Sequence, residues 1–139
     1  MISDDVSVAR PCDDCGAELT GELTQRIVGD RLHWADECHC PHCGAAWVTC
    51  GWDDTPAEIR EALIAQRGLA RLTVEGTPTH SRVALLKVFR EAGASLPEAT
   101  AAAQRAVTTG IEGTRTELAL LAQRLQTKNI SAIIDGDCC

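Results

Sequence analysis

The segment Cys12-Asp13-Asp14-Cys15-Gly16 and its later counterpart Cys40-Pro41-His42-Cys43-Gly44 repeat one pattern, Cys-x-x-Cys-Gly. Two residues between cysteines allow one tight turn to direct both sulfurs at a single ion. The glycine that follows permits a left-handed or extended backbone that brings amide N–H groups onto those sulfurs. Residues 16–39 separate the two copies, a spacing typical of four sulfurs that bind one Zn²⁺ at about 2.3 Å. We therefore predict a metal site whose ligands are Cys12, Cys15, Cys40 and Cys43.

The residues between the two copies predict a β-hairpin. Apolar residues at Leu23, Ile27, Leu32 and Trp34 lie on either side of a Gly29-Asp30 break, which favours two short strands joined by a tight turn. This arrangement resembles a zinc ribbon over about residues 10–50, and the resemblance implies a structural zinc ion. The cysteine pattern is also similar to that of rubredoxin, which implies iron as the alternative metal. Rubredoxin packs aromatic rings around its metal, whereas this chain has no tyrosine and one phenylalanine.

Two further cysteines and one histidine lie close to the predicted ligands in sequence. Cys38 and Cys50 are interpreted as small buried or half-buried residues, with a role as alternative ligands or as a disulfide left open. His33 is expected to be a surface residue of a strand rather than a ligand.

Composition indicates a globular protein of one ordinary domain or two small ones, with 139 residues, 45% hydrophobic and 24% charged. A segment of about 40 residues buries too little apolar surface to fold alone, so the metal would replace the missing core of the first part. No apolar run approaches the roughly 18 residues of a membrane span, and the first residues lack the features of a secretory signal. We expect a cytoplasmic protein, where thiols stay reduced and bind metal.

Charge is distributed unevenly along the chain. Residues 1–54 hold eleven acidic and three basic side chains, which gives −8, and residues 55–139 hold nine acidic and ten basic side chains, which gives +1; the sum is the net charge of −7. An acidic first part repels phosphate groups, so nucleic-acid binding through the ribbon is disfavoured.

The remaining sequence predicts a connecting helix and a second domain. Thr55-Pro56-Ala57-Glu58 has the pattern of a capping box that opens a helix ending at Gly68. The order expected after it is β-α-α-β-α-β, with further capping boxes at Ser95–Glu98 and Thr114–Glu117. We therefore predict an α+β protein with four parts: a zinc ribbon (1–54), a connecting helix (55–68), a βααβαβ domain (69–135) and a Cys-Cys tail (136–139).

The second domain is similar to the C-terminal domain of the bacterial ribosomal stalk protein over about residues 70–135. The similarity rests on the segments 83–92 (Val-Ala-Leu-Leu-Lys-Val-Phe-Arg-Glu-Ala) and 93–99 (Gly-Ala-Ser-Leu-Pro-Glu-Ala), and on the helix and Ile-rich strand that follow. It implies a bacterial protein-docking module, also used by an adaptor of the Clp protease, in which Lys87 and Arg90 contact the partner. The next helix departs from the family, with Pro97 and Thr100 at positions that carry lysine there.

No pattern of an active site is present: the sequence has no phosphate loop, dinucleotide fingerprint or serine elbow. We therefore expect a non-enzymatic, zinc-binding adaptor that docks a protein partner in translation or proteolysis, with no role at a membrane. One alternative is a redox or metal-transfer protein that uses iron at the Cys-x-x-Cys turns or the terminal Cys138-Cys139 pair. A second alternative is a nucleic-acid-binding zinc ribbon.

Overall fold

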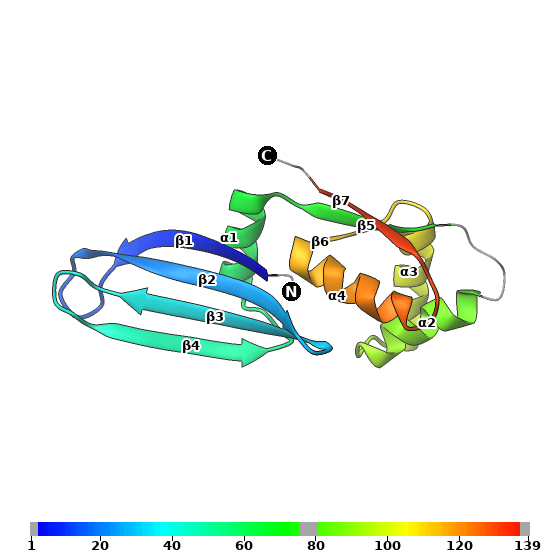
Figure 1. Cartoon of the computed structure of the whole chain (residues 1–139), viewed down its shortest axis with the longest axis horizontal. Helices are drawn as coiled ribbons and strands as arrows, with labels where there is room; N and C mark the ends of the chain where they lie inside the picture. Colours follow the sequence, from blue (N-terminus) through cyan, green and yellow to red (C-terminus); the bar gives the residue numbers. More distant parts are fainter. Residues whose placement is uncertain (1–2, 76–80, 137–139) are drawn as a thin grey trace. The chain divides into compact units, whose positions relative to one another are not determined.

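The computed structural model describes residues 3–75 and 81–136 and confirms a mixed α+β fold. The chain divides into two compact units, Met1–Gly68 and Leu69–Cys139. The first unit is a four-stranded antiparallel sheet in the order β1-β2-β3-β4 with one helix, α1. The second unit has the predicted order βααβαβ and a three-stranded antiparallel sheet in the order β6-β5-β7 (Figure 1).

The bounds of the elements are as follows. The first unit contains β1 Ser3–Pro11, β2 Glu18–Val28, β3 Arg31–His39, β4 Ala46–Trp52 and α1 Ala57–Arg67. The second unit contains β5 Ala70–Val74, α2 Ser81–Glu91, α3 Leu96–Val107, β6 Ile111–Gly113, α4 Arg115–Gln126 and β7 Ala132–Gly136.

The predicted hairpin forms the centre of the first sheet. β2 and β3 are joined through Gly29, which has a φ of 65°, and pair in a register that places Thr20 opposite His39. β1 was not predicted from the sequence. It pairs with β2 along its whole length, and only Val6 among its residues is buried. Alternation between apolar and polar residues is short in β1, so tertiary pairing rather than local pattern defines this strand.

Helix α1 covers one face of the sheet, and its start differs from the prediction. Ile59 and Leu63 pack against Val6 and Leu23 in a small apolar cluster. The capping box predicted at Thr55 is wrong, because Pro56 occupies the N-cap and no side chain caps the helix.

The hydroxyl of Thr55 accepts a hydrogen bond from a buried side chain instead of capping the helix. Its Oγ1 accepts a hydrogen bond of 2.9 Å from Nε2 of Gln25, a residue that is fully buried in β2. A buried amide without partners is costly, so this bond outweighs the local preference of threonine for a helix cap.

The core of the second unit combines large side chains from the sheet and from α2 with small ones from α3. Leu72 and Leu85 are almost fully buried, and Ala99, Ala102 and Ala106 form the buried face of α3. These alanines are spaced three and four residues apart, so they share one face and allow close approach of α3 to its neighbours.

Two predicted capping boxes are confirmed in this unit. At α3, the backbone N–H of Glu98 donates to Oγ of Ser95, and the N–H of Ser95 donates to the Glu98 carboxylate. At α4, Thr114 and Glu117 make the same pair of bonds, at 3.1 and 3.0 Å.

We expect Thr114→Ala to lower the free energy of unfolding by about 1 kcal/mol, because it removes the side-chain acceptor at the start of α4. Thr100→Ala is the matched control, since Thr100 is exposed inside α3 and its hydroxyl donates back to the carbonyl of Leu96 in the same helix. Its effect should stay within about 0.5 kcal/mol. Urea unfolding followed by circular dichroism measures both, and equal losses would contradict a cap at Thr114.

The capping box at α3 also predicts a pH effect. Hydrogen bonds from the Ser95 backbone and then its side chain lower the pKa of Glu98. Because the folded pKa lies below the unfolded one, the stabilisation is complete above the ordinary glutamate pKa of about 4.3 and is lost as pH falls through the folded pKa. An NMR titration should give a lower pKa for Glu98 in the natural chain than in Ser95→Ala, and identical values would argue against this box.

Candidate metal centre

The two Cys-x-x-Cys-Gly turns lie at the same end of the first sheet. The first turn joins β1 to β2 and the second joins β3 to β4. Pairing places Pro11 opposite Glu18, Thr20 opposite His39, and His39 opposite Ala46, so the ends of all four strands are aligned beside the turns. The register of the sheet therefore brings together cysteines that are far apart in sequence.

The two turns have the same backbone geometry. The N–H of Gly16 donates to the carbonyl of Cys12 at 2.8 Å, and the N–H of Gly44 donates to the carbonyl of Cys40 at 2.9 Å. Both glycines have positive φ, 75° and 79°, which is the left-handed region that glycine adopts without strain. The glycine after each cysteine pair is thus required by the conformation of the turn.

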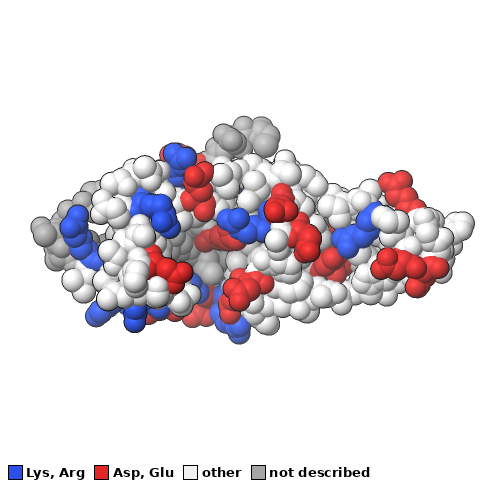
Figure 2. Space-filling model, turned by 180° about the vertical axis from the view of Figure 1, so that it is seen from behind, with Lys and Arg blue, Asp and Glu red and all other residues white. Residues whose placement is uncertain are grey.

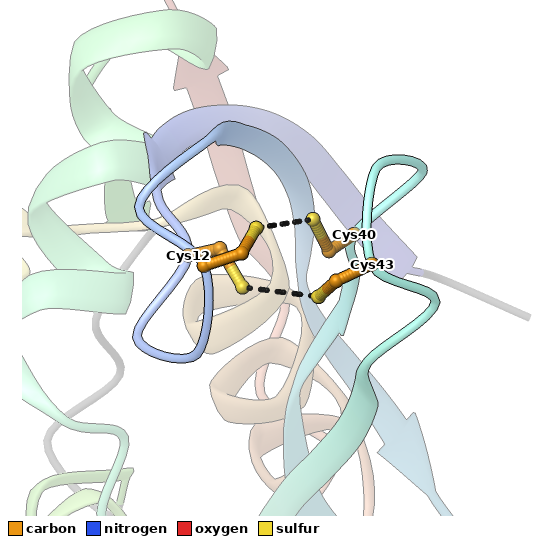
Figure 3. A group of neighbouring side chains, drawn as sticks. Cys12, Cys40 and Cys43 are labelled. Carbon is orange, nitrogen blue, oxygen red and sulfur yellow. Dashed lines mark hydrogen bonds between the residues drawn. The ribbon is translucent and has the colours of Figure 1, made fainter.

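The four predicted ligands are brought together in the structure. The Sγ atoms of Cys12, Cys15, Cys40 and Cys43 all lie within 4.8 Å of one another. Sγ of Cys12 is 3.7 Å from Sγ of Cys43, and Sγ of Cys15 is 3.6 Å from Sγ of Cys40 (Figure 3). A regular tetrahedron with metal–sulfur bonds of about 2.3 Å has edges of about 3.8 Å, so this spacing fits one metal ion at the centre.

The four sulfurs differ in exposure. Cys12 and Cys40, the first cysteine of each turn, are buried with 3% and 0% of their surface exposed. Cys15 and Cys43, the second of each turn, are exposed. The buried pair packs with Leu19 and Cys38 in an apolar cluster, so the site has one side against the sheet and one side toward solvent.

Backbone amides stabilise negative charge on the sulfurs to different degrees. The pKa of Cys40 is lowered to about 6, first by the backbone N–H of Cys43 and also by that of His42. The N–H of Ala17 lowers the pKa of Cys15, but desolvation and the neighbouring sulfurs raise it overall to about 12. Four thiolates so close together repel one another, and a divalent cation removes this cost by reducing a charge of −4 to −2.

A side-chain network that no sequence motif indicated lies beside the site. Arg10 in β1 donates from Nη1 and Nη2 to the two carboxylate oxygens of Asp36 in β3, at 3.1 and 3.0 Å. This ion pair crosses Gly21 of the intervening β2: a Cβ there would lie 2.9 Å from Nη2 of Arg10 and 3.3 Å from Sγ of Cys38. A glycine inside a predicted strand was the one available indication of this close approach.

Cys38 belongs to this network and is separate from the metal site. Its thiol is buried and donates to Oδ1 of Asp36 at 3.4 Å. Desolvation and the hydrogen bond to Asp36 raise the pKa of Cys38, which keeps the thiol protonated. The interpretation of Cys38 as a small buried residue is therefore confirmed.

Cys50 and His33, the other residues of the first unit considered as possible ligands, lie outside the cluster of four sulfurs. Cys50 is a free cysteine in β4 and is exposed, so its expected burial is wrong. His33 lies on β3 with its ring edge-on to Trp52, at a centroid distance of 4.8 Å. Cys138 and Cys139 lie outside the described residues.

Lys87 and Arg90, the predicted partner-contacting residues, are both exposed on α2 of the second unit. A spacing of three residues places them next to each other on the helix surface. α2 and α3 also line a groove of about 170 Å³, and the basic residue in its lining is Arg82. Its lining includes apolar side chains from both helices: Leu85, Leu86, Ala103 and Val107.

Comparisons with protein-family models, with curated proteins and with solved structures find no match to this chain. Within residues 3–75 and 81–136, no helix is both long enough and apolar enough to cross a membrane.

We expect the purified full-length chain to bind one metal ion, and Cys12→Ser to weaken binding by at least about 100-fold because it removes a buried ligand. Cys50→Ser is the matched control, since Cys50 is exposed and outside the sulfur cluster. Competition with a chromophoric chelator measures both affinities. Equal affinity in the two variants, or a first unit that stays folded without metal in NMR spectra, would contradict the site.

Proposed function

We propose that the protein is a non-enzymatic adaptor in which a structural Zn²⁺ holds the first unit and the second unit docks a protein partner. The observation that carries the first half of this proposal is the cluster of four sulfurs within 4.8 Å of one another. Four sulfurs complete a tetrahedral shell and leave no position for a substrate, which is the arrangement of structural rather than catalytic zinc sites.

Zinc is favoured over iron by the surroundings of the sulfurs. The cluster packs against Leu19, Ala17, Ala45 and Trp47, with a single aromatic ring among them. The aromatic shell that the rubredoxin resemblance implies is therefore reduced to one tryptophan. Either metal suits four thiolates, so elemental analysis of protein purified without added metal decides between them.

The docking half of the proposal rests on α2 and its similarity to the ribosomal stalk domain. The βααβαβ order and the antiparallel sheet β6-β5-β7 agree with that similarity. Lys87 and Arg90 supply adjacent positive charges on α2, and Arg82 of the same helix lines the apolar groove, which together fit an acidic protein surface with one apolar anchor. We infer that such a partner belongs to translation or proteolysis in the cytoplasm.

We expect the double variant Lys87→Glu/Arg90→Glu to weaken partner binding at least about tenfold, because two attractive charges become repulsive. Arg105→Glu/Arg115→Glu is the matched control: it makes the same charge change at exposed positions of the second unit on α3 and α4. Quantitative mass spectrometry of proteins captured by each variant identifies the partner, and calorimetry with the purified partner gives the affinity. Equal binding by both variants would contradict docking through α2.

One observation favours metal transfer as a second candidate function. Cys15 and Cys43 are exposed, so an incoming thiol can reach two of the four ligands. Rapid exchange of bound zinc with an acceptor protein, compared with exchange in a closed zinc finger, distinguishes this function from a purely structural site.

Nucleic-acid binding receives no support from the charges. On the face shown in Figure 2, acidic and basic side chains are interspersed, and that face has no continuous patch of lysine and arginine. A backbone-binding surface needs such a patch to release counterions from phosphates.

A further inference from the structure

The two edge strands of the first sheet are protected to different degrees. At the β1 edge, side chains of α1 hydrogen-bond to backbone carbonyls of the strand. Nε2 of Gln66 donates to the carbonyl of Ser7 at 2.9 Å, and Nη2 of Arg67 donates to the carbonyl of Asp5 at 2.9 Å. β1 also ends in Pro11, which cannot donate to a neighbouring strand. These features block the addition of a further strand at β1.

β4 forms the other edge, where Arg31 lies 4.7 Å over the ring of Trp52 but, among the described residues, no side chain hydrogen-bonds to the backbone of the strand. It pairs with β3 alone in the sheet order of the described chain. Its sequence, Ala46-Trp47-Val48-Thr49-Cys50-Gly51-Trp52, contains no charged residue and no proline. Val48 is 63% exposed and Trp52 is 44% exposed. Natural proteins normally place lysine, proline or a bulge on such an edge, so a bare apolar edge indicates a strand that is paired in the functional state.

The hydrogen-bond pattern identifies the backbone groups that β4 offers to a partner. The N–H of Asp53 donates to the carbonyl of Leu32 at 2.7 Å, and these residues are opposite each other in the register that continues from His33 and Trp52. Hydrogen-bonded pairs alternate with non-bonded pairs along an antiparallel ladder. The backbone N–H and C=O groups of Trp47, Thr49 and Gly51 therefore point toward β3. The outward backbone groups belong to Ala46, Val48, Cys50 and Trp52.

The side chains of β4 are complementary to those of a second β4 strand that runs antiparallel to it. A two-fold axis through Thr49 places Ala46 opposite Trp52 of a second copy, and Trp47 opposite Gly51. Each tryptophan then faces a small residue, and every outward residue meets another outward residue, as an antiparallel ladder requires. We propose that β4 pairs antiparallel with β4 of a second copy of this chain, which joins two four-stranded sheets into one eight-stranded sheet.

The position of Trp34 supports this occupant over an unrelated strand. Its ring lies over Gly51, where an added Cβ would be 2.7 Å from a ring carbon. In the proposed register Trp47 of the second copy lies beside Gly51 and thus next to Trp34, where two aromatic rings stabilise each other by stacking or edge-to-face contact. The uncharged strand also brings no like charges directly opposite each other.

The first test measures the mass of the metal-loaded full-length chain by sedimentation velocity over a range of concentrations. Salt of about 0.5 M screens the net charge of −7. We expect a dimer whose dissociation constant rises at least about tenfold in Cys50→Pro, because proline removes one outward N–H on each copy and leaves the ladder with β3 intact. Val48→Lys, which adds charge at the edge, is a second variant with the same expectation should Cys50→Pro lose its metal.

The second test checks the register by disulfide formation in chains that carry Cys50→Ala, Cys138→Ser and Cys139→Ser. Thr49 meets its own copy as a non-bonded pair with a Cα separation of about 4.5 Å, within the range of a disulfide. With diamide as the acceptor of two electrons and two protons, Thr49→Cys should form a covalent dimer. Ala46→Cys, opposite Trp52 of the second copy, should not.

The outcomes separate the possible occupants of the β4 edge. Dimerisation that is lost in the edge variants, with cross-linking at position 49 alone, supports the proposal. A monomer at all concentrations up to about 1 mM, where even a weak dimer is populated, overturns it and leaves the edge to a strand from another protein. A dimer that is unaffected by both Cys50→Pro and Val48→Lys also overturns it, because its interface lies elsewhere.

Discussion

The meeting of four cysteine sulfurs at one end of a four-stranded sheet is the constraint on which the first unit depends. Apart from this site, residues 3–68 of the unit form two small apolar clusters, one between α1 and the sheet and one around the buried cysteines. Such clusters stabilise a segment of this size weakly against the conformational entropy of the chain. A metal ion held by both turns would cross-link the β1–β2 connection to the β3–β4 connection, and its binding free energy would contribute to the free energy of folding.

The sheet and the metal site support each other. The ladder aligns the strand ends, and the ion pair between Arg10 and Asp36 spans β2 to connect β1 with β3 immediately beside the sulfurs. This pair is partly buried and bidentate, which is the geometry in which an ion pair contributes most to orientation. Gly21 is the residue that permits the crossing, so a position without a side chain determines how charged groups meet above it.

The second unit reaches stability in a different way, through a continuous apolar core and helices with well-defined starts. Alanines on α3 keep the buried face of that helix flat, and larger residues of α2 and the sheet fill the space. The exposed side of α2 is then free to carry Lys87 and Arg90. One chain therefore combines a unit that carries a candidate metal site with a unit that has a continuous apolar core.

The sequence alone determined the elements whose causes are local. The Cys-x-x-Cys-Gly turns, the hairpin around Gly29, the capping boxes at Ser95 and Thr114 and the βααβαβ order each follow from residues close together in the chain. Tertiary structure alone decided the features that depend on residues far apart. Strand β1 exists because β2 pairs with it. Thr55 does not cap α1 because its hydroxyl accepts a hydrogen bond from the buried Gln25. The thiol of Cys38 has Asp36 as its hydrogen-bond partner because Asp36 also binds Arg10 across β2. For Thr55 the contact made on folding outweighs a capping preference worth about 1 kcal/mol, and in all three cases no local pattern records which distant residue will be the partner.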